Sequence, residues 1–395
     1  MTTRNIHPFP ARMASEIVEK RLITLKRGSL LLDPMCGSGT TVVAGRVSNV
    51  RAFGVDRDPL AVMLSSAASA NLPSAELLDD ASRILKRAEV LYTRLDGRSA
   101  YPLHCDLESR EFLRFWFDVV ARKQLLALML ALGESRCDTE IFIRIAISKM
   151  IITKGPGVSR AQDVSHSRPH RTCDIPENRP FSLLMSSVRA IISASRFSSD
   201  CTAEKATVTL GDCRTLEYYS NGVFDCVITS PPYLNAIDYL RGHKLSLVWF
   251  GYLISDIRLL RSSNVGTERG SQSHEFDWIV ERMISAPECL SPRMLGVCRQ
   301  YAKDLYHTMR SISRVSKFGA YVGIVIGDCE IRGVEVMNSL AVGAIAAQVG
   351  LKLTATSIRE IDQSRRYLPA PQQASCNSAF VKRLWREMVL EFIVT

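Results

Sequence analysis

The sequence predicts an α/β fold with a mixed seven-stranded sheet and a mainly helical insertion. Residues 14–55 show the alternation of helix, strand, glycine-rich turn, helix and strand that is typical of a β-α-β unit. Residues 74–206 instead show the apolar spacing of helices, and the α/β alternation returns after residue 207. We therefore predict three segments, 1–73, 74–206 and 207–395, of which the first and last form one α/β domain.

Each element of this fold is predicted from its apolar pattern. Strands are expected at residues 29–32, 51–55, 207–210, 224–228, 321–326, 351–358 and 388–394. Helices are expected at residues 14–25, 40–47, 75–95, 108–132, 139–152, 181–194, 239–253, 295–315 and 334–349. The last two strands flank a polar loop and can pair antiparallel, which would make the sheet mixed.

Composition favours a soluble, cytoplasmic protein with a large core and no membrane segment. The chain has 395 residues, of which 46% are hydrophobic. No apolar run approaches the length of about 18 residues that a membrane span needs, and the polar N-terminus does not resemble a signal peptide. The eleven cysteines include no Cys-x-x-Cys pair, and the seven histidines show no metal-ligand spacing. We therefore expect reduced thiols and no metal site.

The net charge of +10 and the pI near 9.1 favour a polyanionic partner, although ordinary variation in net charge explains these values equally well. Three polar, basic loops are predicted at residues 160–171, 258–269 and 359–366. Each loop can contact a nucleic-acid duplex or can be plain solvated surface. The candidate contacts are Arg168, Arg171, Arg261, Arg269 and Arg366.

A glycine-rich turn follows the first predicted strand. Gly37 and Gly39 can take positive φ and let a ligand approach the backbone, and the following helix offers free N–H groups to a carboxylate. Asp33, at the strand end, can accept from an ammonium group. The methionine part of S-adenosylmethionine carries both groups. A phosphate-binding loop is the rival interpretation, but no Gly-Lys-[Ser/Thr] is present. The candidate residues are Asp33, Pro34, Met35, Cys36, Gly37, Ser38, Gly39 and Thr40.

Two further strands end in an aspartate. Asp56 is placed to accept from ribose hydroxyls, as in dinucleotide sites, although it can also be a helix N-cap before Pro59. Asp212 can accept from an adenine amino group or can be a simple turn residue. We assign the following residues, Arg57 and Cys213, to the same cofactor site.

The apolar run that ends at Thr229 is followed by Ser230-Pro231-Pro232-Tyr233. Such a strand carries a polar acceptor, a stiff turn and an aromatic ring to the edge of a sheet, because proline fixes φ. Taken alone, the same letters also occur in plain proline turns after a buried strand.

The glycine-rich turn followed by Ser-Pro-Pro-Tyr resembles the S-adenosylmethionine-dependent amino-methyltransferases, and the serine form is similar to the DNA cytosine-N4 branch. The resemblance covers residues 6–66 and 207–394. It implies a Rossmann-like methyltransferase fold with S-adenosylmethionine as cofactor and double-stranded DNA as partner. Residues 7–12 resemble the family segment that closes over the cofactor, which places Phe9 and Pro10 near the methionine moiety. The alternative is an N-terminal arm packed on the core.

The resemblance also implies a mechanism. The exocyclic amine of cytosine is a poor nucleophile because its lone pair is delocalised into the ring. The Ser230 hydroxyl and the Pro231 carbonyl would accept its hydrogens, and Tyr233 would stack on a base flipped out of the duplex. Methyl transfer would then be in-line and driven by positioning. Cytosine-C5 methyltransferases instead use a Pro-Cys pair, which this chain lacks.

Several alternatives stay open. Adenine-N6 methylation of DNA uses nearly the same pocket, and RNA guanine-N2 methyltransferases share the glycine turn and a Pro-Pro-Tyr. A catalytically dead DNA-binding protein is a third. The resemblance implies a restriction–modification role, with a cognate restriction endonuclease as a further partner. The insertion lies where these enzymes do not usually have one, so it is either the target-recognition region, with Arg168 and Arg171 as candidates, or a dimer interface or brace.

Overall fold

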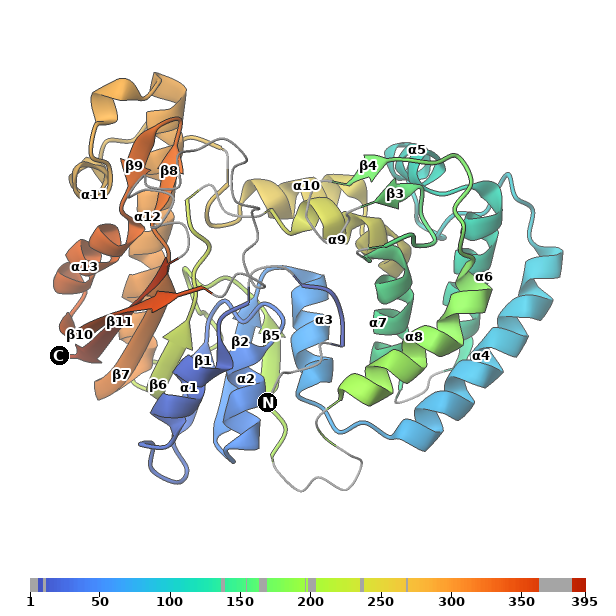
Figure 1. Cartoon of the computed structure of the whole chain (residues 1–395), viewed down its shortest axis with the longest axis horizontal. Coiled ribbons are helices and arrows are strands. Elements are labelled where there is room, and N and C mark those ends of the chain that lie inside the picture. Colours follow the sequence, from blue (N-terminus) through green and yellow to red (C-terminus); the bar gives the residue numbers. More distant parts are fainter. Residues whose placement is uncertain are drawn as a thin grey trace. The chain divides into compact units, whose positions relative to one another are not determined.

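The computed structural model describes residues 6–9, 12–135, 139–153, 155–162, 169–195, 197, 204–234, 238–267, 269–361 and 386–395. They form two compact units (Figure 1). The helical unit comprises residues 1–10, 58–202 and 238–261, and the sheet unit comprises residues 11–57, 203–237 and 262–395. No helix in the described part of the chain is both long and apolar enough to cross a membrane.

The sheet unit contains a seven-stranded sheet in the order β10-β11-β7-β6-β1-β2-β5. Strand β11 is antiparallel to both of its neighbours, and the other pairs are parallel. This Rossmann-like arrangement confirms the predicted mixed sheet and the antiparallel pairing of the last two strands. The bounds are β1 Leu30–Asp33, β2 Arg51–Asp56, β5 Thr207–Leu210, β6 Phe224–Thr229, β7 Ser316–Ile326, β10 Leu351–Glu360 and β11 Arg386–Val394.

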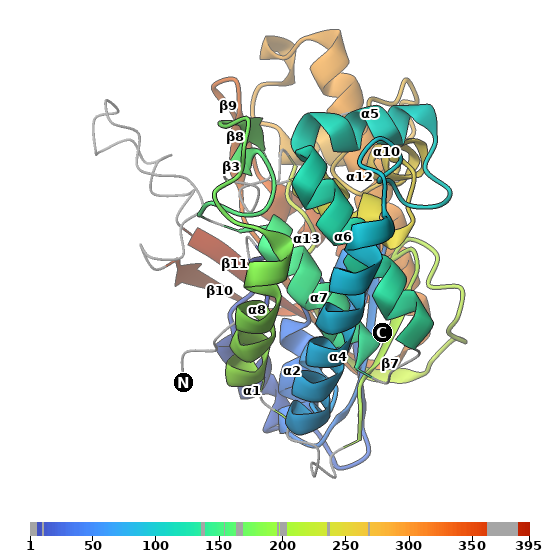
Figure 2. The ribbon, with the colours of Figure 1, turned by 90° about the vertical axis from the view of Figure 1, so that its right-hand side faces the viewer.

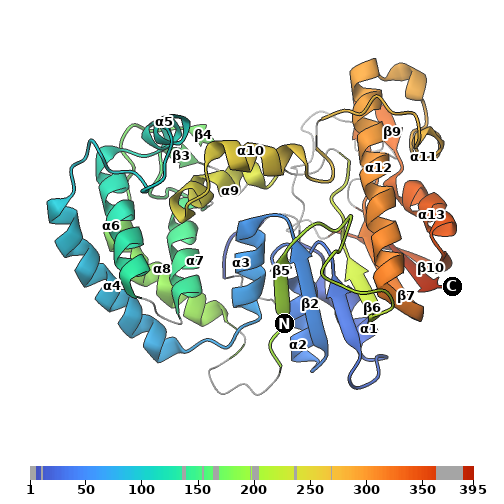
Figure 3. The same ribbon diagram turned by 180° about the vertical axis from the view of Figure 1, so that it is seen from behind.

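Helices cover both faces of this sheet because its central strands are apolar on both sides. Leu31 packs with α1 (Ser15–Leu22) and α2 (Thr40–Val47), whereas Leu32 packs with α12 (Pro292–Val315) and α13 (Asn338–Gln348). Figure 3 shows α12 and α13 from behind. A shorter helix, α11, spans Asp277–Met283.

The strand order reverses between β1 and β6. From β1 the chain continues to β2 and β5 on one side, and it later returns to β6 and β7 on the other. In open α/β sheets, ligands bind outside the carboxyl ends of the strands at such a switch point. A ligand-binding site is therefore expected at the residues that follow β1 and β6.

The helical unit is built from long amphipathic helices. In α4, the buried residues Leu77, Ala81, Ile84 and Ala88 recur every three or four positions, so one face enters the core. Helix α4 packs against α6 and α8, and α7 also packs against α8 (Figure 2). The bounds are α3 Pro59–Ala68, α4 Ser74–Arg94, α5 Leu107–Trp116, α6 Val119–Ser135, α7 Glu140–Ile151, α8 Pro180–Ala194, α9 Leu240–Leu247 and α10 Ile254–Ser262. Two short strands, β3 Ala161–Gln162 and β4 His170–Arg171, pair antiparallel.

Some predicted elements were wrong in extent or type. The helix expected at residues 108–132 is two helices, because the Asp118 carboxylate accepts from the Ala121 N–H at 2.7 Å and starts α6 anew. Residues 334–336 are not helical but form β9, which pairs with β8 (Cys329–Ile331) across a turn in which Arg332 and Gly333 have positive φ. The basic loop expected at 258–269 begins inside α10, so Arg261 lies on a helix.

Candidate active site

Asp33 and the Ser-Pro-Pro-Tyr motif meet at the switch point of the sheet. Asp33 ends β1 and is 3% exposed, and Thr229 ends the adjacent parallel strand β6. The Thr229 hydroxyl donates a hydrogen bond to Asp33 Oδ1 at 2.7 Å. Ser230 follows Thr229 directly. The start of the glycine turn and the residue that precedes the Ser-Pro-Pro-Tyr motif are therefore joined by a short hydrogen bond between neighbouring strand ends.

The glycine turn has the backbone that its sequence predicts. Gly37 and Gly39 have φ of 50° and 90°, and Gly39 is the N-cap of α2. The Cys36 N–H donates to the Val55 carbonyl at 3.0 Å, and the Gly37 N–H donates to Asp56 Oδ2 at 2.8 Å. The turn is thus held against the end of β2, with Pro34, Met35, Ser38 and Thr40 in the same stretch.

Gly54 is a further requirement of this turn. A Cβ atom at position 54 would lie 3.0 Å from Cys36 Sγ and 3.1 Å from a Val42 methyl group. Cys36 itself is buried, and its small apolar side chain fills the space that Gly54 leaves. Gly54 therefore lets the turn pack closely against β2. In the sequence it is visible as the first residue of Gly54-Val55-Asp56.

Burial dominates the electrostatics of Asp33. Loss of solvent raises the pKa of this carboxyl to about 6, and hydrogen bonds from Thr41, Thr229 and the Met35 N–H oppose that rise. The Met35 N–H lies 3.2 Å from Asp33 Oδ1. A buried acid whose anion lacks solvent is stabilised by a cation, so the turn suits a positively charged ligand group.

Asp212 lies in a network of ion pairs. Arg57 Nη1 donates to Asp212 Oδ2 at 2.8 Å, and Arg214 donates to both Asp212 oxygens and to Asp304 Oδ1 at 2.7 Å. Burial works in the opposite direction, but the hydrogen bonds and charge of Arg214, with the charge of Arg57, lower the pKa of Asp212. Both acceptor oxygens already have arginine partners, so the predicted adenine contact would add a further donor to a carboxylate that is already occupied.

The remaining cofactor candidates lie in different surroundings. Cys213 is buried, with Sγ 3.4 Å from the Thr308 hydroxyl. Phe9 belongs to the helical unit, where its ring stacks on Tyr239 with centroids 4.9 Å apart. The preceding His7 bonds to the Ser148 hydroxyl at 2.9 Å. Pro10 lies outside the described residues.

The Ser-Pro-Pro-Tyr motif is supported by residues that the sequence did not single out. A Cβ atom at Gly327, just after β7, would come within 2.8 Å of the Tyr233 ring. The Tyr301 hydroxyl, on α12, donates to the Pro232 carbonyl at 3.1 Å. The Tyr233 hydroxyl donates to Glu387 Oε1 at 3.4 Å. Gly327 directly follows a strand, and that position was its only sequence signal.

Three of the five arginines predicted to contact DNA are described. Arg171, on β4, forms an ion pair with Asp174 and lies 5.4 Å from the centre of the Phe115 ring. Arg261, on α10, pairs with Asp238. Arg269 is exposed in the loop that precedes α11. Arg168 and Arg366 lie outside the described residues.

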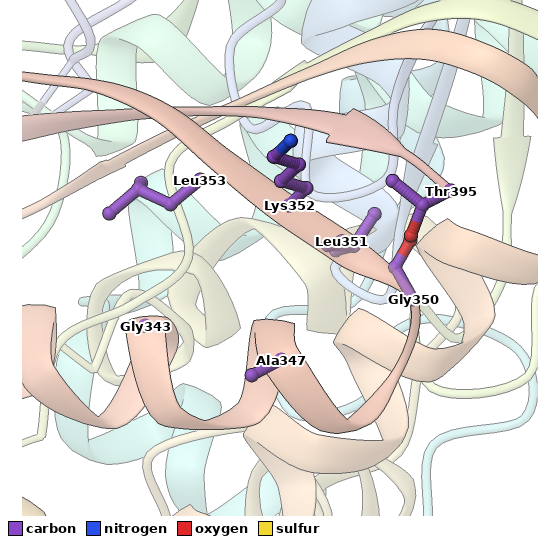
Figure 4. A pocket seen from close by; sticks show the side chains of 7 residues that line it. All are labelled: Gly343, Ala347, Gly350, Leu351, Lys352, Leu353 and Thr395. Carbon is purple, nitrogen blue, oxygen red and sulfur yellow. The ribbon is translucent and has the colours of Figure 1, made fainter.

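Two further features of the described residues bear on function. They contain no cluster of histidine, cysteine, aspartate and glutamate that could hold a metal ion. A shallow cavity of about 420 Å³ lies between α13 and β10 (Figure 4). It contains none of the candidate site residues and is lined by Gly343, Ala347, Gly350, Leu351, Lys352, Leu353 and Thr395.

Comparison with known proteins finds similarity to Type II methyltransferases. No family model matches the chain. The Type II methyltransferase M.MvaI of Kocuria varians is 20% identical, over 92% of this chain and 85% of the relative. This chain is thus similar to a Type II methyltransferase along most of its length. The Type II methyltransferase M.AvaI, from a Nostoc species and from Anabaena variabilis, is 25% identical over 164 residues, which are 35% of this chain and 33% of the relatives.

Solved structures give weaker matches. A SAM-dependent methyltransferase from Methanosarcina mazei is 8% identical with a TM-score of 0.34, over 94% of this chain and 95% of the other. A TehB-like SAM-dependent methyltransferase from Corynebacterium glutamicum is 9% identical with a TM-score of 0.30, over 96% and 88% of the two chains. At these scores the fold assignment depends on the strand order of the protein itself.

Proposed function

We propose that the protein is an S-adenosylmethionine-dependent DNA methyltransferase that methylates the N4 amine of cytosine in a base flipped out of the duplex. The observation that carries the proposal is the hydrogen bond from Thr229 to Asp33, because it joins the cofactor turn to the catalytic motif at the switch point. Similarity to Type II methyltransferases supports DNA as the substrate. A restriction–modification system with a cognate endonuclease is the setting that the family resemblance implies.

The residues at the turn fit the cofactor. Asp33 is a buried carboxyl that gains from a cation, and it would accept from the cofactor ammonium group. The positive φ at Gly37 and Gly39 leaves room for the methionine carboxylate to approach the N-terminus of α2. Asp56 would accept from the ribose hydroxyls. Bound S-adenosylmethionine supplies the electrophilic methyl group.

Cofactor affinity is expected to depend on pH through Asp33. Only the ionised carboxylate attracts the ammonium group, so below a pKa of about 6 a proton must leave before the cofactor binds. Affinity should then fall by up to about tenfold per pH unit. Calorimetry between pH 7 and 5 measures this slope. The Asp33→Asn variant should bind more weakly and lose the slope, and a wild-type affinity that is constant over this range would refute the role of Asp33.

The motif would activate the target amine by holding it. The Ser230 hydroxyl and the Pro231 carbonyl each accept a hydrogen bond from the target amine. These two hydrogen bonds turn the nitrogen lone pair towards the methyl sulfonium. The N–CH₃ bond forms as the S–CH₃ bond breaks, and one amine proton leaves to solvent. The Tyr233 ring stacks on the flipped base. Positioning supplies the rate enhancement, and no covalent enzyme intermediate is needed.

Serine at position 230 favours cytosine-N4 over adenine-N6 methylation, for which the resemblance would give aspartate or asparagine. The intact motif argues against a catalytically dead protein.

We also propose that the insertion recognises the DNA target. Its described candidate residue is Arg171, which lies beside Phe115. An Arg171→Ala variant should weaken DNA binding in a salt titration while cofactor affinity is kept, and unchanged DNA binding would move recognition elsewhere.

Labelled methyl groups are expected to move to DNA and not to RNA. The purified protein, incubated with methyl-labelled S-adenosylmethionine, should label DNA from a methylase-deficient bacterial host and leave transfer RNA unlabelled. Scintillation counting of the two nucleic acids gives the answer. A protein that labels transfer RNA alone would be an RNA methyltransferase, the strongest rival from outside DNA modification.

A further inference from the structure

An ion pair across the β10–β11 hairpin reaches the catalytic motif. Arg359 and Glu387 are direct partners in the antiparallel register, and Arg359 Nη1 lies 3.1 Å from Glu387 Oε2. The other carboxylate oxygen, Oε1, accepts from the Tyr233 hydroxyl. Each oxygen of Glu387 therefore has its own partner, and the side chain connects the hairpin to the motif.

Arg359 is committed to this arrangement. The sequence placed it in a basic loop that could contact DNA, but it lies on β10, and its guanidinium also comes within 3.7 Å of Glu16. Its side chain is 26% exposed, compared with 11% for that of Glu387. The cation thus balances a buried carboxylate.

Two further contacts hold Tyr233. Its ring lies close to Gly327, where no side chain keeps the ring away. One residue earlier, the Tyr301 hydroxyl donates to the Pro232 carbonyl and so holds the backbone that leads to Tyr233. With the ring against Gly327, the hydroxyl contact with Glu387 fixes the direction of the ring axis. A change in this direction would alter how a base stacks on the ring.

Burying a carboxylate costs free energy, because the charged group loses its contact with water. Burial raises the pKa of Glu387, and the charge of Arg359 and the Tyr233 hydrogen bond only oppose that rise. Apolar residues of similar volume often replace buried ion pairs without loss of stability. A function at the motif would explain why this position carries an acid.

We propose that Glu387 is a positioning residue for methyl transfer, which orients Tyr233 for stacking on the target base and is itself held by Arg359. This inference rests on the proposed function. It assigns no contact between Glu387 and the reacting atoms. It predicts that Glu387 acts only through the Tyr233 hydroxyl, and that prediction separates positioning from general support of the fold.

The test is a double-mutant cycle on turnover. Glu387→Met keeps the side-chain volume and removes the acceptor, and Glu387→Gln keeps an acceptor oxygen. With methyl-labelled S-adenosylmethionine and unmethylated bacterial DNA, Glu387→Met should lower kcat by about tenfold, which corresponds to about 1.4 kcal/mol. The KM for the cofactor should not change. Glu387→Gln should restore most of kcat, and Glu387→Met should cost nothing further in a Tyr233→Phe background.

Glu360→Ala is the matched control. It removes the neighbouring ion pair, Arg386 to Glu360 at 3.4 Å, which does not include Tyr233, so kcat should stay at the wild-type value. Unchanged kcat in Glu387→Met, or an equal loss in the Tyr233→Phe background, would overturn the inference. A wild-type protein that labels no DNA would instead refute the proposed function and this inference with it. Circular dichroism shows whether Glu387→Met folds. If it does not, Glu387→Gln and Tyr233→Phe serve as the test. The inference then requires that both variants fold, that Tyr233→Phe loses turnover and that Glu387→Gln keeps it.

Discussion

Replacing Ser230 by alanine is expected to lower the rate of methyl transfer by about 100-fold, which is the loss typical of removing one preorganised hydrogen-bonding group. Ser230 would supply one of the two acceptors for the target amine, and the remaining Pro231 carbonyl cannot hold the amine alone. The glycine turn is untouched. Cofactor affinity should therefore stay at the wild-type value, and the loss should appear in kcat. Single-turnover assays with labelled cofactor measure the step directly.

Ser220→Ala is a suitable control, because Ser220 is an exposed serine in the loop that precedes β6. Its rate should match the wild type. A Ser230→Ala variant that also keeps the full rate would show that the serine only shapes the turn, and the proposed activation of the amine would be wrong.

Replacing Asp56 by alanine is expected to weaken cofactor binding by about 10- to 100-fold. Hydrogen bonds to charged groups contribute about 1.5–3 kcal/mol, and Asp56 would accept from the ribose hydroxyls. Its carboxylate also holds the Gly37 N–H at 2.8 Å, so the alanine variant loosens the turn that binds the methionine part. Both effects act on the same affinity, which isothermal titration calorimetry measures.

Asp56→Asn separates the two contributions. Its amide oxygen can still accept from Gly37, so the turn should stay in place while the charge is lost, and the affinity should fall between those of wild type and alanine. Circular dichroism should show an intact fold for both variants. Wild-type affinity in Asp56→Ala would remove Asp56 from the cofactor site.

The sheet could be predicted because its strands are short apolar runs between polar turns. The runs at residues 30–32 and 224–229 are buried at almost every position, which is the pattern of central parallel strands. Strand β7 was predicted five residues too short at its start, because Lys317, Phe318 and Gly319 are exposed and Gly319 has positive φ. The β8–β9 hairpin was missed because Val334 and Val336 also fit the apolar spacing of the helix that follows.

The site could be predicted only where its residues are contiguous in sequence. The glycine turn and the Ser-Pro-Pro-Tyr motif each occupy one short stretch, so the sequence shows them whole. Glu387 and Tyr301 support the motif from positions far along the chain, and no local pattern indicates a contact with Tyr233 or Pro232. The same holds for Asp212, whose partner Arg57 is 155 positions away, so the ion-pair network emerged only with the fold.

The product of the reaction tests the central proposal most directly. The gene should be expressed in a bacterial host that lacks its own DNA methylation, and the host DNA should be digested to nucleosides and analysed by mass spectrometry. Cells with the wild-type gene should contain N4-methylcytosine, and cells with the Ser230→Ala variant should contain little or none. N6-methyladenine as the only modified nucleoside, formed by the wild-type protein, would contradict the assignment of cytosine as the target.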